Sequence, residues 1–89
     1  MKVLITKSAR QFGYVIWNSK SADEIDKILG GKSDIEVNFN GFALGKKSID
    51  WKYHRISIGY KFTRALPETA RFYYIELKDG ILEVTTKNA

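Results

Sequence analysis

Apolar and polar residues alternate over residues 34–39, with the apolar side chains at the odd positions. A period of two residues is typical of a strand with one buried face. Asn40 and Gly41 follow directly, and both tolerate the positive φ angles of a tight hairpin turn. The pattern therefore predicts a first antiparallel hairpin, whose return strand is residues 42–44.

Alternation continues through residues 49–62, but its phase changes part-way. Residues 49–53 are apolar at odd positions, whereas residues 56–62 are apolar at even positions. Because a change of phase sends side chains to the other face of a strand, we expect a bulge or a tight turn near His54. Beyond it, residues 54–62 are predicted to form one strand with these side chains on one face: Ile56, Ile58, Tyr60 and Phe62.

A second hairpin and a single helix complete the predicted elements. Residues 72–86 are rich in aromatic and β-branched side chains, and Asp79-Gly80 supplies a turn between them. Ser21 with Glu24 three residues later forms a capping-box pattern, and Gly30 suits the end of that helix. We therefore expect a small α+β fold dominated by antiparallel β-hairpins with one short helix, in a single domain of all 89 residues.

Length and composition exclude several classes of protein. The chain has no cysteine, which excludes a disulfide framework, a thiolate zinc site and a cysteine nucleophile. The longest apolar run, residues 14–17, is far shorter than the roughly 20 residues of a membrane span, and residues 2–10 lack the pattern of a signal peptide. His54 is the single histidine, and no nucleophile with its base is recognisable. We expect a cytoplasmic, non-enzymatic protein with no cofactor, no metal ion and no membrane partner.

Positive charge is concentrated in one part of the chain. The net charge is +5, and residues 46–64 carry six cations against the single acid Asp50. That segment alone therefore accounts for the excess, because the remaining residues balance. The same segment carries several aromatic rings, and interleaved cations and rings are what a surface needs to hold phosphates and stack on bases.

This combination predicts a small nucleic-acid-binding protein, with DNA a better candidate than RNA and transcription regulation as the expected role. The candidate contacts in the basic segment are Lys46, Lys47, Trp51, Lys52, Tyr53, Arg55, Lys61 and Arg64. A second interpretation is a protein–protein interaction module, such as a small phage- or plasmid-encoded inhibitor or an assembly subunit. Basic strands also bind acidic proteins, and open strand edges favour pairing with another chain, including a homodimer.

The first half of the chain resembles the swapped-hairpin module of AbrB/MazE/SpoVT-type DNA-binding regulators and antitoxins. The resemblance consists of a strand, a basic loop, a second strand, a short helix ending in glycine and a hairpin. The two strands, the helix and the hairpin correspond to residues 5–8, 13–16, 21–31 and 34–41. It implies an intertwined homodimer whose basic N-terminal loops enter DNA grooves. Lys7 and Arg10 are the matching contact residues in this chain.

Overall fold

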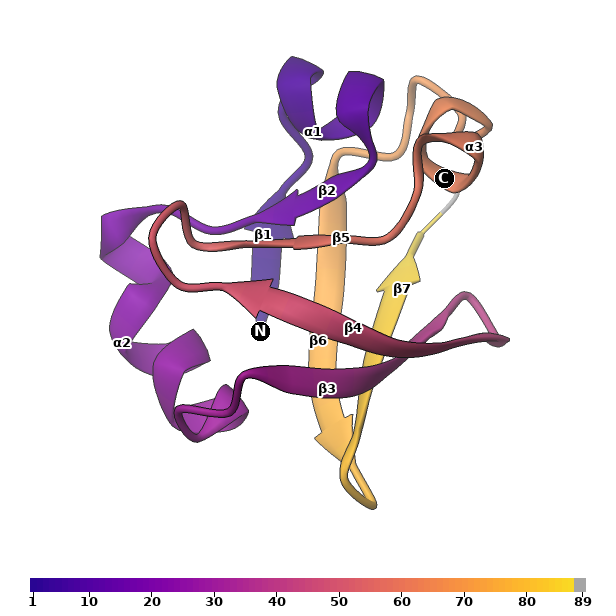
Figure 1. Ribbon diagram of the computed structural model, residues 1–89. Helices are drawn as coiled ribbons and strands as arrows, with labels where there is room; N and C mark the ends of the chain where they lie inside the picture. Colours follow the sequence, from indigo (N-terminus) through magenta and orange to yellow (C-terminus); the bar gives the residue numbers. More distant parts are fainter. Residues whose placement is uncertain (88–89) are drawn as a thin grey trace.

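The computed structural model of the chain describes residues 1–87, apart from the side chains of residues 19–21. The described residues form seven strands and three helices (Figure 1). In chain order these are β1 (Lys2–Leu4), α1 (Lys7–Phe12), β2 (Tyr14–Ile16), α2 (Ser19–Leu29), β3 (Asp34–Phe39), β4 (Phe42–Asp50), β5 (Arg55–Ser57), α3 (Tyr60–Arg64), β6 (Phe72–Lys78) and β7 (Ile81–Thr86).

Both predicted hairpins form. Asn40 (φ 47°) and Gly41 (φ 88°) connect β3 to β4, while Asp79 (φ 52°) and Gly80 (φ 78°) connect β6 to β7. Two consecutive positive φ angles are typical of the turn whose twist matches that of paired strands, which is why these dipeptides form it. The first return strand extends to Asp50, well beyond the three residues expected for it.

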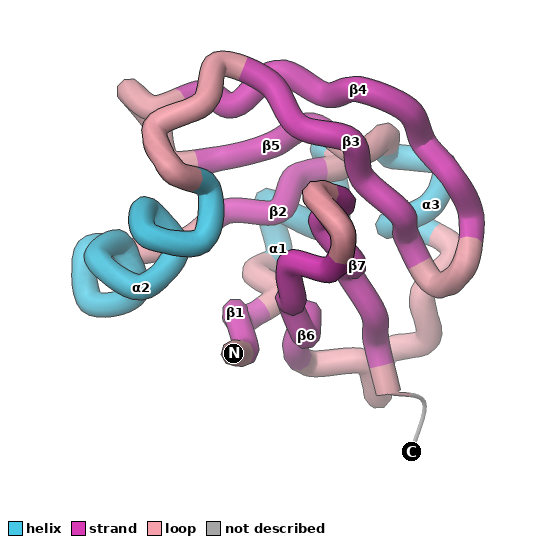
Figure 2. Tube along the Cα trace, turned by 90° about the horizontal axis from the view of Figure 1, so that it is seen from below, coloured by secondary structure: helices cyan, strands magenta, loops and turns pink. Residues whose placement is uncertain are grey.

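The sheet is nearly closed, which the expectation of separate hairpins with one helix did not include. Its strand order is β1-β6-β7-β3-β4-β5-β2, and the contact between β3 and β7 is parallel. The two end strands, β1 and β2, lie against each other, so the strands curl around one core (Figures 1 and 2). Closure covers apolar faces that a small domain with few helical residues would otherwise leave exposed.

The core fills the inside of this curled sheet. Ile35, Val37 and Phe39 of β3 are buried, as the alternation predicted. Tyr73 on β6 is fully buried, and its hydroxyl donates a hydrogen bond to the backbone carbonyl of Tyr14 at 3.2 Å. This bond ties β6 to β2 across the inside of the sheet.

Helix α2 covers the core from one side, at the left of Figure 1, with Ile25 and Leu29 buried. Gly30 follows its last residue with a φ of 63°, as expected of a helix end. The helix begins at Ser19, however, so Ser21 lies within it and is not its first cap. The capping contact predicted for the Ser21 side chain lies outside the described residues.

The strand predicted over residues 54–62 is wrong in its second half. The turn near His54 is confirmed, because this residue has a φ of 53°. Strand β5 then ends at Ser57 and α3 follows, with Tyr60 and Phe62 exposed. The physical reason lies at position 13, whose carbonyl accepts the backbone N–H groups of Ile58 (2.7 Å) and Gly59 (3.1 Å) and so turns the chain away from the sheet.

The strand expected over residues 5–8 from the family resemblance is also absent. Strand β1 ends at Leu4, and Thr6 begins α1 by accepting the backbone N–H of Ala9 at 3.0 Å with its hydroxyl oxygen. The segment expected as a basic loop is therefore the helix α1. It ends at Gly13, which has a φ of 80°.

Candidate nucleic-acid interface

A guanidinium in contact with two tyrosine rings lies on the outer face of β2 and β5. Arg55 stands 4.4 Å from the ring centroid of Tyr14 and 4.8 Å from that of Tyr53. Strands β2 and β5 are antiparallel neighbours, and Ile16 is paired with Arg55. Side chains at alternate positions of a strand share one face, so Tyr14 and Arg55 both point outward.

Two further side chains extend this stack. The Phe12 ring lies 6.5 Å from that of Tyr14, and the Lys52 ammonium lies 5.4 Å from the centre of the Tyr53 ring. We name the five residues the cation–aromatic strip: Phe12, Tyr14, Lys52, Tyr53 and Arg55. The rings at its two ends are the most open, with Phe12 55% and Tyr53 56% exposed.

Asp50 organises the strip and reduces its charge. Its carboxylate lies 3.3 Å from Nε of Arg55 and also accepts the backbone N–H of Tyr53 at 3.1 Å. The second bond holds the turn that presents the Tyr53 ring. Two cations against one acid leave the strip with about one net positive charge. Its aromatic rings therefore offer a ligand more contact than its charge does.

The basic segment divides between the two faces of the sheet. Lys46 lies opposite Glu36 and Lys47 lies opposite Ile35 in the pairing of β3 with β4. Because consecutive strand residues point to opposite faces, only Lys46 shares the outer face with Arg55. The Trp51 ring is partly buried against the core, and its Nε1 donates to the carbonyl of Lys32 at 2.7 Å.

Helix α3 carries the remaining two cations of the segment. Lys61 is exposed, whereas the Nε of Arg64 donates to the carbonyl of Gln11 at 3.0 Å and its guanidinium lies 4.6 Å from the Tyr60 ring centroid. These contacts fix α3 beside the end of α1. Lys61 therefore lies on an element that adjoins the strip, and Arg64 mainly holds that element in place.

Arg10 is bound within the protein. Its Nη1 donates to the carbonyls of Leu66 (2.8 Å) and Pro67 (3.2 Å), and its Nη2 donates to that of Ala70 (2.7 Å). A guanidinium engaged in this way holds a loop, so we leave Arg10 out of the interface. Lys7, the other residue suggested by the resemblance, is exposed in the first turn of α1.

The sequence analysis missed Phe12 and Tyr14. Both lie outside the basic segment, in a part of the chain with little net charge, so the charge pattern did not single them out. One signal was present: Tyr14 and Ile16 alternate with the buried Val15 and Trp17, which places Tyr14 on an outer face. Which other residues share that face depends on long-range strand pairing.

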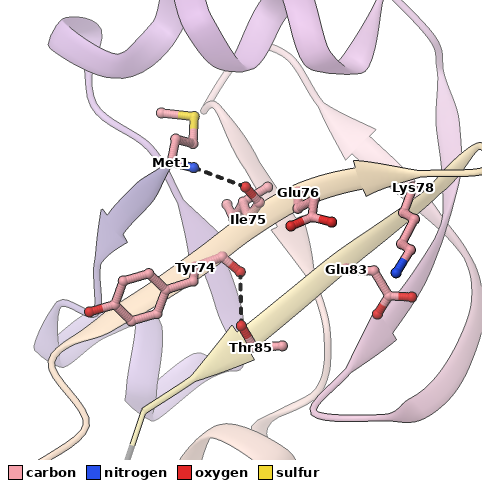
Figure 3. A pocket seen from close by; sticks show the side chains of 7 residues that line it. All are labelled: Met1, Tyr74, Ile75, Glu76, Lys78, Glu83 and Thr85. Carbon is pink, nitrogen blue, oxygen red and sulfur yellow. Dashed lines mark hydrogen bonds between the residues drawn. The ribbon is translucent and has the colours of Figure 1, made fainter.

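Another part of the outer face of the sheet carries acids. On the outer face of β6 and β7, Glu76 lies directly opposite Glu83 in the ladder, and Glu83 accepts a hydrogen bond from Asn38 at 2.9 Å. These carboxylates line a hollow of about 280 Å³ together with Tyr74 and Lys78 (Figure 3). We name Tyr74, Glu76, Lys78, Glu83 and Thr85 the acidic face.

The described residues hold neither a candidate metal site nor a membrane-spanning helix. They contain no group of three or more histidine, cysteine or acidic side chains placed to hold a metal ion. None of their helices has the length and apolar character needed to cross a membrane. His54 is partly buried, with its ring 6.1 Å from that of Trp17.

Comparison with other proteins adds no identification. No family model matches the chain, and no curated protein or solved structure matches it. The cation–aromatic strip is therefore the feature on which a proposal of function rests.

Proposed function

We propose that this protein binds nucleic acid without acting as an enzyme, and that the cation–aromatic strip is its interface. The observation that carries the proposal is the Arg55 guanidinium over the rings of both Tyr14 and Tyr53. Rings provide faces for bases or sugars, and cations attract phosphates. The role of a DNA-binding regulator, expected from the sequence, stays part of this proposal.

Two physical features of the strip support it. Large rings that are more than half exposed, such as Phe12 and Tyr53, keep apolar surface in water that a purely structural residue would bury. The stack also restricts its side chains before any ligand arrives, so less conformational entropy is lost on binding.

A structural interpretation of the stack has to be weighed against this one. Cation–ring pairs occur elsewhere on the surface, with Lys2 at 4.4 Å from the Phe72 ring and Lys87 at 4.6 Å from the Tyr74 ring. Such a pair alone therefore does not mark a binding site. What distinguishes the strip from the Tyr74 pair is the local charge, because the one acid of the strip, Asp50, is outnumbered by two cations, whereas Glu76 and Glu83 lie near Tyr74.

The test is a fluorescence anisotropy titration with labelled nucleic acid over a series of salt concentrations. We expect micromolar binding at low salt, and a slope of about −2 when log affinity is plotted against log salt, as for about three phosphate contacts on a single strand. Lys52→Glu combined with Lys61→Glu should weaken binding by about 10-fold or more.

A charge-matched control is available at two lysines that are not part of the strip. Lys2→Glu combined with Lys87→Glu changes the net charge equally and also removes cations from rings. We expect this control variant to change the affinity for nucleic acid by less than threefold. An equal effect of both double variants would assign binding to net charge alone, and an absence of binding at low salt with about 100 µM protein would end the proposal.

One observation favours the second candidate, a protein-interaction module. Phe42 is 65% exposed at the tip of the β3–β4 hairpin, and its ring lies 6.3 Å from that of Phe62. Exposed rings of this kind are common in protein interfaces. Phe42→Ser should leave nucleic-acid affinity within twofold if the rings serve a separate interface, and the same titration measures this.

A further inference from the structure

We infer that the cation–aromatic strip binds single-stranded nucleic acid in preference to a duplex. The inference rests on the proposed function and narrows its ligand. It depends on which elements of the fold are able to enter a groove, and on how rings and charges are distributed along the strip.

The helices do not suit a major groove. Only α2, with 11 residues, exceeds two turns among the described helices, whereas α1 has six and α3 has five. The exposed residues of α2 include Asp23 and Glu24, which would repel phosphates. A helix that reads duplex DNA needs polar or cationic side chains towards the bases and phosphates.

The β3–β4 ribbon does not suit a groove either. Its tip carries the exposed apolar residues Phe42 and Ala43. On its outer face Glu36 lies opposite Lys46 and Asp34 lies opposite Ser48, so acids match the cations there. A ribbon of this charge gains little from the phosphates on either side of a groove.

The strip itself is better matched to unpaired bases. Tyr14 lies inside the row, whereas Phe12 and Tyr53 are its outermost rings and stay more than half exposed, although Lys52 also lies over the Tyr53 ring. In a duplex each base is covered by its neighbours, so these end rings would find no free base to stack on. In a single strand each stacked base strengthens binding by roughly 5- to 150-fold.

The net charge of the strip also favours a single strand over a duplex. Lys52 and Arg55 against Asp50 leave about one net positive charge on the strip. Duplex binding relies on neutralising many phosphates, and one net charge supplies little of that. Stacking must therefore provide most of the affinity, and only unpaired bases offer it.

The experiment compares three labelled probes of similar length under one low-salt condition: oligo(dT), oligo(U) and a DNA duplex. We expect each single strand, or the one whose sugar the strip accepts, to bind at least 10-fold more tightly than the duplex. Preference for oligo(dT) assigns the ligand to DNA and preference for oligo(U) assigns it to RNA, and both results support the inference.

Variants identify the stacking positions. Tyr53→Ala and Phe12→Ala should each weaken single-strand binding by about fivefold or more, and Tyr53→Phe should restore it because the ring is retained. Tyr74→Ala is the control, since it removes a partly exposed ring with a lysine above it from the acidic face, and should act by less than twofold. Circular dichroism melting confirms that each variant is folded.

The outcomes separate the inference from the function on which it rests. A duplex that binds as tightly as the single strands, with dependence on Lys52 and Lys61, overturns the single-strand inference and keeps the proposed function. Single-strand binding that is indifferent to both Phe12→Ala and Tyr53→Ala also overturns the inference. Failure of all three probes to bind overturns the proposed function.

Discussion

The cation–aromatic strip and the acidic face are built from the same local interaction and differ in charge. Each places a tyrosine ring beside a cation, with Arg55 at Tyr14 in the strip and Lys87 at Tyr74 beside the acidic face. The strip has one acid, Asp50, which is paired with its arginine. On the acidic face two glutamates are opposite each other. The strip thus carries about one net positive charge and the acidic face about one net negative charge, so a polyanion is attracted to the first and repelled by the second.

The two surfaces also differ in how they are supported. The acidic face lies on one hairpin, whose strands are joined by a two-residue turn. The strip draws on α1, β2, β5 and the turn before β5, and it adjoins α3. Contacts between residues more than 50 positions apart, such as Arg10 with Leu66, hold α1 in place. The strip should therefore be the surface that mutation disturbs more easily.

Gly13→Ala should give the largest loss of stability, and it acts on the elements that support the strip. Gly13 has a φ of 80°, and a Cβ there would overlap the backbone of Gly59 and Tyr60, where the carbonyl of residue 13 holds the start of α3. Strain and overlap together should lower the free energy of unfolding by about 3 kcal/mol or more. Urea denaturation measures this.

Gly45→Ala separates conformational strain from overlap. Gly45 has a nearly identical φ of 79°, but no atom lies within 4 Å of its ideal Cβ. We expect a loss of about 1 kcal/mol, from backbone strain alone. Equal losses in the two variants would show that the close approach of α1 to α3 is not what Gly13 provides.

Arg10→Ala should give the next largest effect. It leaves the carbonyls of Leu66, Pro67 and Ala70 without their guanidinium donor, and the loop that they belong to would loosen from α1. We expect a loss of about 2 kcal/mol in urea denaturation. Arg10→Lys should recover only part of it, because an ammonium does not reproduce a forked donor. Full recovery by lysine would mean that charge, and not the fork, holds the loop.

The acidic face follows from local sequence, whereas the strip does not. Alternation and the Asp79-Gly80 turn predict the β6–β7 hairpin, and the pairing of Glu76 with Glu83 follows from counting outward from that turn. The turn at His54 was likewise visible as a change of phase. In these cases each residue's neighbour is a few positions away along the chain.

The strip joins residues that no local pattern connects. Tyr14 meets Arg55 because β2 pairs with β5, and this pairing closes one end of a seven-stranded sheet. The conversion of residues 60–64 from a predicted strand to α3 has the same origin, since a distant carbonyl at Gly13 turns the chain. Periodicity alone gives no account of either event, because both depend on tertiary contacts.

Tyr73 joins β6, a strand of the acidic face, to β2, a strand of the strip. Ionisation of its phenol should have a smaller effect on stability. Burial raises the pKa of its phenol well above the ordinary 10.0, although the nearby Arg10 charge lowers it in part. The folded protein thus keeps a proton that the unfolded chain loses, so this contribution to stability is present below pH 10 and is lost as the pH rises above it. The expected loss is about 1 kcal/mol per pH unit above pH 10.

Tyr73→Phe tests this at two pH values. At pH 7 the variant should lose about 1 kcal/mol, because its ring no longer donates to the carbonyl of Tyr14. Between pH 10 and pH 11 it should lose less stability than the unmodified protein. Tyr60→Phe, which changes an exposed ring, should alter neither value. Parallel alkaline losses in the Tyr73 variant and the unmodified protein would contradict the assignment.

Glu76→Gln should give the smallest effect, and one of opposite sign. Removing one of two facing carboxylates relieves like-charge repulsion, whereas Glu83 keeps its hydrogen bond from Asn38. We expect a gain of about 0.5 kcal/mol in urea denaturation, which added salt should diminish. Glu68→Gln, at an exposed position in the 65–71 loop, changes the net charge equally and should leave stability unchanged. A loss of stability in Glu76→Gln would mean that Lys78 or another cation stabilises this carboxylate, and the acidic face would then hold an internal ion pair, as the strip does in Arg55 with Asp50.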